Sequence, residues 1–181
     1  AEILSKQYPK EFIIWNILGA INASLKKYDE ALIAFKKVIE LNPNYVDAYY
    51  NIGVVLNDQS KIQESIEAYQ KCISLFPKYP DAYVNMGLAL RMQGEIEKSI
   101  ESFLIALELN PNHAEAIFNI GVSLKGVVFK NPNSNLQKVI TSLLDKKTYV
   151  RPKDIIEACI SLLKFEPKLY KHLGKQNFSS L

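Results

Sequence analysis

Small and aromatic residues recur at helical spacing along the first 125 positions of the chain. In three successive segments, a small residue is followed four positions later by an aromatic residue and three positions after that by a residue that is usually small. Spacings of three and four place such residues on one face of an α-helix. The pattern predicts three helices whose buried faces contain Ala31/Phe35/Val38, Ser65/Tyr69/Cys72 and Ser99/Phe103/Ala106.

Another helix is expected before each of these three, and a fourth helix of the same kind after the last of them. Each contains a bulky residue followed by a pair made of an aliphatic residue and glycine. Because glycine has no side chain, two helices can approach each other closely at that point. The bulky residues are Trp15, Tyr49, Tyr83 and Ile117, and the pairs are Leu18-Gly19, Ile52-Gly53, Met86-Gly87 and Ile120-Gly121.

Both patterns have a period of 34 residues. Proline occurs at positions 9, 43, 77 and 111, and glycine at 19, 53, 87 and 121. A unit of two helices does not bury its apolar face alone and stacks on the next unit, so this period is typical of a helical solenoid. Units are expected at 12–45, 46–79 and 80–113, and a fourth begins at 114 but loses the pattern after Lys125.

These units resemble the tetratricopeptide repeat family, and the resemblance covers residues 1 to about 125. It implies an all-α fold: a right-handed superhelix of antiparallel helix-turn-helix repeats, or α-solenoid. The first helix of each repeat would line its concave groove. Departures from the family pattern are modest, since Asn22 replaces a residue that is usually large and Val38 replaces one that is usually alanine.

Both ends of the chain depart from the 34-residue period. The proline at position 9 is in register, so the residues before the first unit are expected to be the remnant of an earlier repeat in a longer protein. Two amphipathic helices, LQKVITSLLDKK and PKDIIEACISLLKF, are predicted near the other end, where they would cap the last repeat. The expected divisions are 1–11 (remnant second helix), 12–45, 46–79 and 80–113 (repeats), 114–135 (incomplete repeat and loop) and 136–181 (C-terminal helical cap).

Composition and charge exclude some classes of protein. The chain of 181 residues is 48% hydrophobic, as in an ordinary globular protein, and no apolar run approaches the roughly 18 residues of a membrane span. We therefore expect a cytoplasmic protein without membrane contact. Residues 126–181 contain 10 Lys+Arg and 4 Asp+Glu, but no nucleic-acid recognition motif accompanies this charge. A solvated face or a seam against a following domain is the favoured interpretation.

Side chains that carry out catalysis or bind metals are sparse. His113 and His172 lack a cysteine, serine or carboxylate partner at an interpretable spacing, and His113 is expected in a surface loop. Cys72 and Cys159 lie far apart and form no metal-ligand pattern. Phosphate-binding loops and hydrolase motifs are also missing. We predict a protein that is not itself an enzyme and that uses no cofactor or metal.

One asparagine per repeat occurs two residues before the repeat glycine, at Asn51, Asn85 and Asn119. The family register places all three in the concave groove, although asparagine is a poor mid-helix residue. Its amide offers both a donor and an acceptor, which suits the main chain of an extended peptide. The arrangement resembles the asparagine ladder of O-GlcNAc-transferase-type proteins, with three rungs, because the first repeat has Ile17 there.

Another interpretation of the asparagines stays open. Duplicated repeats copy each residue whether or not it is useful, and an inward asparagine can bond within its own helix. Neighbouring side chains are expected to add contacts, although first-helix aromatic residues are more often packing residues. The other expected peptide-binding residues are Tyr50, Phe118, Val54, Leu88 and Arg91.

The charged residues of the first helices indicate which kinds of ligand are favoured or disfavoured. A clamp for a C-terminal carboxylate needs cations on successive first helices, and Asp81 in place of the expected lysine disfavours it. Asp47, Asp81 and Glu115 would suit a basic ligand, but a local explanation is favoured. Acids in a first turn interact favourably with the helix macrodipole, and Asn44-x-x-Asp47 and Asn112-x-x-Glu115 resemble capping boxes.

The sequence is compatible with three functions. The favoured one is a protein- or peptide-binding module that acts as a scaffold or recognition arm through its concave groove. The second is the substrate-recognition region of a larger bacterial transferase, glycosyltransferase- or sulfotransferase-like, whose catalytic domain lies elsewhere. The third is an oligomerisation spacer, since exposed terminal repeats can pair into a homo-oligomer.

Overall fold

The computed structural model describes residues 3, 7–125, 136–137 and 158–161. Every regular element within these residues is a helix, which confirms the predicted all-α fold. The chain divides into two compact units, residues 1–109 and 110–181, and each is described by itself. No helix among the described residues is long and apolar enough to cross a membrane.

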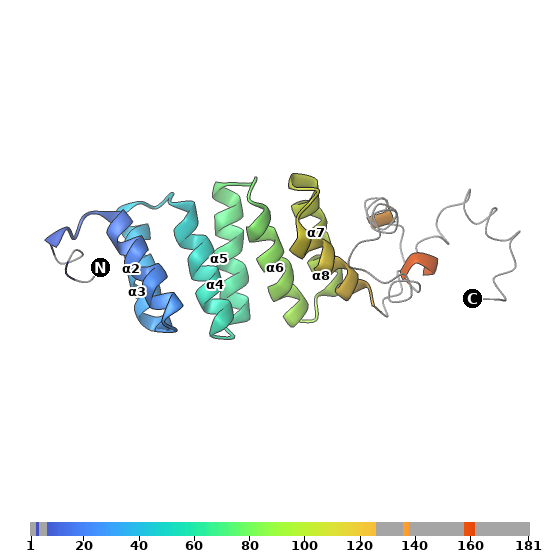
Figure 1. The fold of residues 1–181 in the computed structure, drawn as a ribbon, viewed down its shortest axis with the longest axis horizontal. Coiled ribbons are helices and arrows are strands. Elements are labelled where there is room, and N and C mark those ends of the chain that lie inside the picture. The colour runs from blue at the N-terminus through green and yellow to red at the C-terminus, as the bar shows by residue number, and fades with distance from the viewer. Residues whose placement is uncertain (1–2, 4–6, 126–135, 138–157, 162–181) are drawn as a thin grey trace, which may run out of the picture. The chain divides into compact units, whose positions relative to one another are not determined.

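The first unit consists of three helical hairpins (Figure 1). In each hairpin, a first helix and a second helix are joined by a turn of three residues. The helices pack extensively within a hairpin, and the second helix of each of the first two hairpins also contacts the first helix of the next hairpin. Their bounds are α2 (Phe12–Ser24), α3 (Tyr28–Leu41), α4 (Val46–Asp58), α5 (Ile62–Leu75), α6 (Pro80–Met92) and α7 (Ile96–Leu109).

The turn inside each hairpin has the same backbone geometry. Lys26, Ser60 and Gly94 occupy equivalent positions and all have positive φ, at 58°, 60° and 82°. The next amide N–H bonds back to a carbonyl of the first helix, as in Lys61 N–H to Leu56 O at 2.9 Å. This is the Schellman ending, in which one left-handed residue satisfies carbonyls at the end of a helix.

The turn that precedes a first helix is also repeated, and in α2 and α4 it is tied to the helix through the periodic proline. The Trp15 indole nitrogen donates to the Pro9 carbonyl oxygen at 3.0 Å, and the Tyr49 hydroxyl donates to the Pro43 carbonyl oxygen at the same distance. Trp15 and Tyr49, the bulky residues early in α2 and α4, thus connect these helices to the preceding turns by a hydrogen bond.

The predicted core triplets are confirmed, since all nine side chains are buried. The periodic glycines explain how closely the helices of a hairpin pack. A Cβ atom at Gly53 would lie 2.5 Å from Cε1 of Tyr69, and one at Gly19 would lie 2.6 Å from Cε1 of Phe35. Ser65 reinforces the contact by donating a hydrogen bond to the Gly53 carbonyl oxygen at 2.8 Å.

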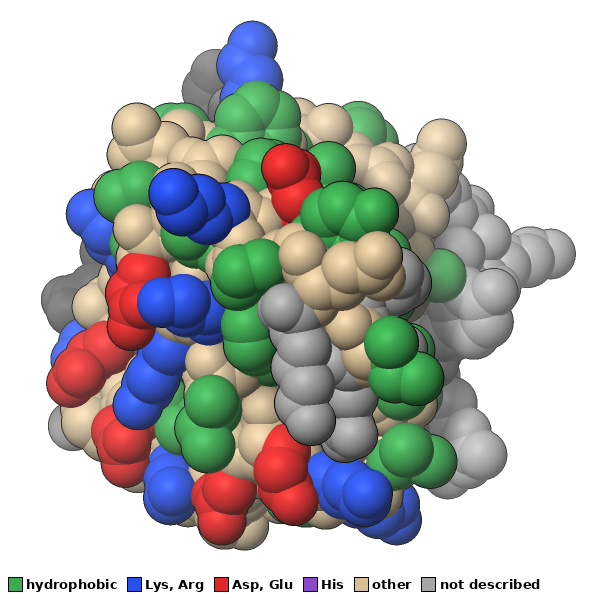
Figure 2. Space-filling model, turned by 90° about the vertical axis from the view of Figure 1, so that its left-hand side faces the viewer, with side chains coloured by type: hydrophobic (Ala, Val, Ile, Leu, Met, Phe, Trp, Pro, Cys, Tyr) green, Lys and Arg blue, Asp and Glu red, His purple; other side chains and the backbone are tan. Residues whose placement is uncertain are grey.

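First helices also contact one another, α2 with α4 and α4 with α6. Comparable contacts are not found among α3, α5 and α7 of the same unit. Within the first unit, the first helices therefore form the more closely spaced layer, as expected of the inner layer of a solenoid. Figure 2, which looks at the end of the unit where α2 and α3 lie, shows hydrophobic side chains exposed among charged ones.

The second unit contains α8 (Ala114–Leu124), in which Ala116, Ile117, Ile120 and Leu124 are buried. Short helical pieces are also described at 136–137 and 158–161. The rest of the expected loop and cap, and most of the expected remnant helix before residue 7, lies outside the described residues.

Candidate functional site

Asn51 and Asn85 occupy the same register on the neighbouring helices α4 and α6, and both are half-buried. The Asn51 side chain makes no hydrogen bond to any residue that the structure describes. Since it is partly exposed, both ends of its amide can bond to a ligand. A partly exposed amide in the middle of a helix contributes little to the fold, so this residue is the strongest candidate for binding.

Asn85 differs because one side of its amide is already used. Its Nδ2 donates to the Tyr50 hydroxyl oxygen at 2.9 Å, a bond that links α6 to α4. Its Oδ1 has no partner among the described residues. The bond fixes the amide so that Oδ1, an acceptor, remains for a ligand N–H.

Tyr50 is held in place by two further aromatic rings. It stacks on Tyr79 with ring centroids 5.1 Å apart and an interplanar angle of 22°, and it lies at 6.0 Å and 54° from Tyr69. The Tyr79 hydroxyl donates to Asp47 Oδ1 at 3.5 Å. Burial, and then the negative charge of Asp47, raise the pKa of Tyr79, so it stays a neutral donor. Tyr50 thus positions Asn85 from within a packed cluster.

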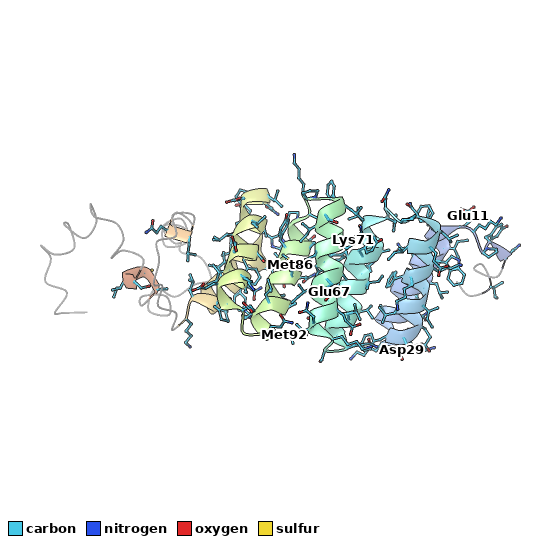
Figure 3. All side chains as sticks on the ribbon, turned by 180° about the vertical axis from the view of Figure 1, so that it is seen from behind. Glu11, Asp29, Glu67, Lys71, Met86 and Met92 are labelled. Atoms are coloured by element: carbon cyan, nitrogen blue, oxygen red, sulfur yellow. The ribbon has the colours of Figure 1, made fainter. Side chains whose placement is uncertain are left out.

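The other predicted residues of the first unit lie near these asparagines. Val54 and Leu88 follow Asn51 and Asn85 by three positions and are half-buried, and Arg91 is half-buried in the last turn of α6. Figure 3 labels Met92, which follows Arg91 and is exposed, and also shows Glu67 and Lys71 on the second helix α5. The Lys71 ammonium lies 6.0 Å from the centroid of the Tyr49 ring.

Asn119 has different surroundings, although its register is the same. It lies in the second unit with an exposed fraction of 4%, and its Nδ2 donates to the Glu115 carbonyl oxygen of its own helix at 2.9 Å. This is the arrangement described by the alternative interpretation of the asparagines. Its predicted neighbour Phe118 is 52% exposed on the same helix.

The capping boxes expected from the sequence are wrong. The N-cap residue of α4 is Tyr45 rather than Asn44, and its side chain makes no capping bond. The N-cap of α8 is His113, whose Nδ1 accepts from the Ala116 N–H at 3.3 Å. His113 is therefore a half-buried, non-helical residue that caps α8 from the preceding turn. The prediction failed because both helices begin one residue later than the capping pattern requires.

The macrodipole interpretation of the acids is confirmed in its geometry, since Asp47, Asp81 and Glu115 all lie in the first turns of their helices. Among the described residues, no three side chains of the kinds that ligate metals are grouped together. Cys72 is buried, and burial raises the pKa of its thiol from 9.0 to about 11.

Comparisons with known proteins agree with this architecture. A family model described as TPR repeat matches residues 19–60, and one described as tetratricopeptide repeat matches 46–79 and 80–113. A curated relative, the peroxisomal targeting signal receptor of Candida albicans, is 44% identical over 46 residues. That match covers 25% of this chain and spans 8% of the receptor's length.

Three solved structures illustrate the fold. A crystal structure of MamA is 26% identical with a TM-score of 0.69, covering 81% of this chain and 84% of MamA. The first TPR of Spaghetti (RPAP3), bound to the HSP90 peptide SRMEEVD, is 21% identical with a TM-score of 0.61, covering 62% of this chain and 90% of that one. An O-GlcNAc transferase mutant of Thermobaculum terrenum is 17% identical with a TM-score of 0.62, covering 75% and 26% respectively.

The matched repeats run without a gap from residue 19 to residue 113, which is just over half of the 181 positions. They coincide with the helical hairpins of the first unit and with its periodic glycines and prolines. The chain therefore belongs to the tetratricopeptide repeat family.

Proposed function

We propose that this chain binds an extended segment of another protein along the first helices α2, α4 and α6, and that Asn51 and Asn85 hold its main chain. The observation that carries the proposal is the Asn51 amide, which is half-buried and makes no hydrogen bond to any described residue. Asn85 adds an oriented acceptor in the same register one repeat later.

The spacing of the two asparagines suits a main-chain ligand. Packed helices lie about 8–10 Å apart, and an extended chain advances about 3.3 Å per residue. One asparagine would therefore meet about every third residue of a peptide that crosses the first helices. Bonds to the peptide's own N–H and C=O groups require no particular side chain.

The named relatives support the proposal in a general way. The structure of the RPAP3 repeat domain contains a bound peptide, so the shared fold is able to hold one. The curated relative that is 44% identical over 46 residues is named as a receptor for a targeting signal. Protein binding is thus the role that the family membership supports, and the two asparagines are the residues that we propose for it.

The test is a binding screen of extended peptides against the wild type and the double variant Asn51→Ala/Asn85→Ala. Loss of several hydrogen bonds should weaken binding by about 2 kcal/mol, which is about a thirtyfold rise in Kd. Gln70→Ala removes an exposed amide from the second helix α5 and is the matched control. Circular dichroism checks that all three proteins keep the same helix content.

Two results would contradict the proposal. Equal binding by the wild type and the double variant would show that another surface carries recognition. Absence of peptide binding by the wild type would instead favour the spacer function.

A further inference from the structure

The first-helix surface changes its chemistry from one repeat to the next, and this bears on which segment it binds. Resting on the proposed function, we propose that the ligand combines a large apolar side chain, seated on α2, with lysine or arginine residues, seated on α4. An acidic segment would be rejected.

The α2 end of the surface is apolar. Ile13 and Ile17 are 54% and 49% exposed, and they lie one helical turn apart on the same face. In the next repeat, their registers are occupied by Asp47 and Asn51. Partly exposed isoleucines on the binding layer favour an apolar partner, because contact would remove them from water.

The corresponding face of α4 has an acidic residue at each end and an asparagine between them. Asp47, Asn51, Val54 and Asp58 are spaced by four, three and four residues and so lie in one stripe. Both aspartates are exposed. Asn51 therefore lies between two carboxylates. Asp47 is one helical turn before it, and Asp58 is two turns after it.

The helix macrodipole explains only part of this charge. Asp47, in the first turn, is favoured by the dipole, but Asp58 is the last residue of α4, where the dipole disfavours an acid. The sequences of α2, α4 and α6 also contain no lysine, and their charged residues are Asp47, Asp58, Asp81 and Arg91. This surface is thus complementary to a basic segment, and Asp81 extends the acidic charge to α6.

On α6, the same stripe consists of Asp81, Asn85, Leu88 and Met92. Met92 is 61% exposed, and its flexible thioether suits varied apolar partners (Figure 3). The three stripes together specify an order along the ligand: an apolar side chain over α2, basic side chains over α4 and mixed side chains over α6.

The experiment uses three labelled peptides of 12 residues made of alanine and serine. The first contains one leucine followed by two lysines, the second has glutamates for the lysines, and the third has serine for the leucine. Fluorescence anisotropy measures their affinities for the wild type, for Asp47→Asn/Asp58→Asn and for Ile17→Asn. The matched controls are Glu64→Gln/Glu101→Gln and Ile33→Asn, which change exposed residues of second helices.

We expect the lysine peptide to bind at least about tenfold more tightly than the glutamate peptide. This ratio should fall in Asp47→Asn/Asp58→Asn and at high salt, which screens exposed charges. Ile17→Asn should reduce the advantage of leucine over serine. Neither control variant should change either ratio.

The outcomes separate this inference from the proposed function. Equal binding of the lysine and glutamate peptides, with both weakened in Asn51→Ala/Asn85→Ala, would overturn the inference and leave the proposed function intact. Absence of binding by all peptides would overturn both. Concentration-dependent dimers that are lost in Ile17→Asn but kept in Ile33→Asn would assign the isoleucines to a second copy, and would also overturn the inference.

Discussion

The Tyr50 hydroxyl oxygen accepts a hydrogen bond from the Asn85 side-chain amide at 2.9 Å, and this bond connects residues 35 positions apart in the sequence. It joins the first helices of two successive repeats. Because Tyr50 is itself stacked on Tyr79, the position of the Asn85 amide depends on how closely these repeats pack.

Replacement of Tyr50 by phenylalanine should release Asn85 and weaken peptide binding. The ring contacts would remain, so we expect little change in helix content, while the peptide Kd should rise by the equivalent of about 1 kcal/mol. Fluorescence anisotropy measures the affinity. Tyr83→Phe is the matched control, since Tyr83 is a half-buried tyrosine of α6. Unchanged affinity in Tyr50→Phe would contradict a positioning role for this hydroxyl.

Addition of a methyl group at Gly53 should destabilise the first unit. A Cβ there would lie 2.5 Å from Cε1 of Tyr69, which is fully buried and has little room to move. We expect Gly53→Ala to lower the free energy of unfolding by about 1–3 kcal/mol in urea denaturation. A smaller residue in place of Tyr69 should relieve the clash, so Gly53→Ala should lower the free energy of unfolding by less in a Tyr69→Leu background. Equal costs in both backgrounds would show that the ring is not the cause.

The fold was predictable from the sequence because each repeat imposes the same physical requirement. Phe35, Tyr69 and Phe103 are buried at one register, since a helix presents one face to its hairpin partner. The glycines opposite them follow from the same contact. These features are local to one hairpin, and the 34-residue period reveals them directly.

The site was less predictable because its properties arise between repeats or from single side chains. Asn51 and Asn119 share a register, yet only Asn119 is buried and bonded to its own helix. The bond between Tyr50 and Asn85 depends on the spacing of two repeats, which no periodic pattern specifies. Similarly, His113 caps α8 through a single nitrogen, and histidine is not among the residues that usually cap a helix N-terminus.

The hairpin turns offer a stabilising substitution. Ser60 has a φ of 60°, a left-handed conformation that is strained for residues with a side chain, and Gly94 fills the equivalent place in the next repeat. We expect Ser60→Gly to raise the free energy of unfolding by about 0.5–1 kcal/mol in urea denaturation. Ser74→Gly, within the helix α5, is the control and should lower it. A loss of stability in Ser60→Gly would contradict this account.

The buried thiol of Cys72 should make the stability of the fold depend on alkaline pH. Burial, aided by the charge of Asp47, raises its pKa from 9.0 to about 11. Between these values the unfolded chain releases a proton that the folded chain retains, so the free energy of unfolding falls as pH rises. The contribution is fully present below about pH 9, and about 1 kcal/mol of it should be lost by about pH 10.

Urea denaturation from about pH 8 to about pH 10 measures this loss. In this range the thiol should titrate before the buried tyrosines, because burial also raises the pKa of Tyr69 and Tyr79. Cys72→Ala is the appropriate comparison, since alanine occupies the same register at Ala106 and is fully buried there. The variant should be less stable at every pH because it leaves a small cavity, but its stability should decline less steeply between these pH values. Parallel pH profiles for the two proteins would show that another group, and not the Cys72 thiol, titrates on unfolding.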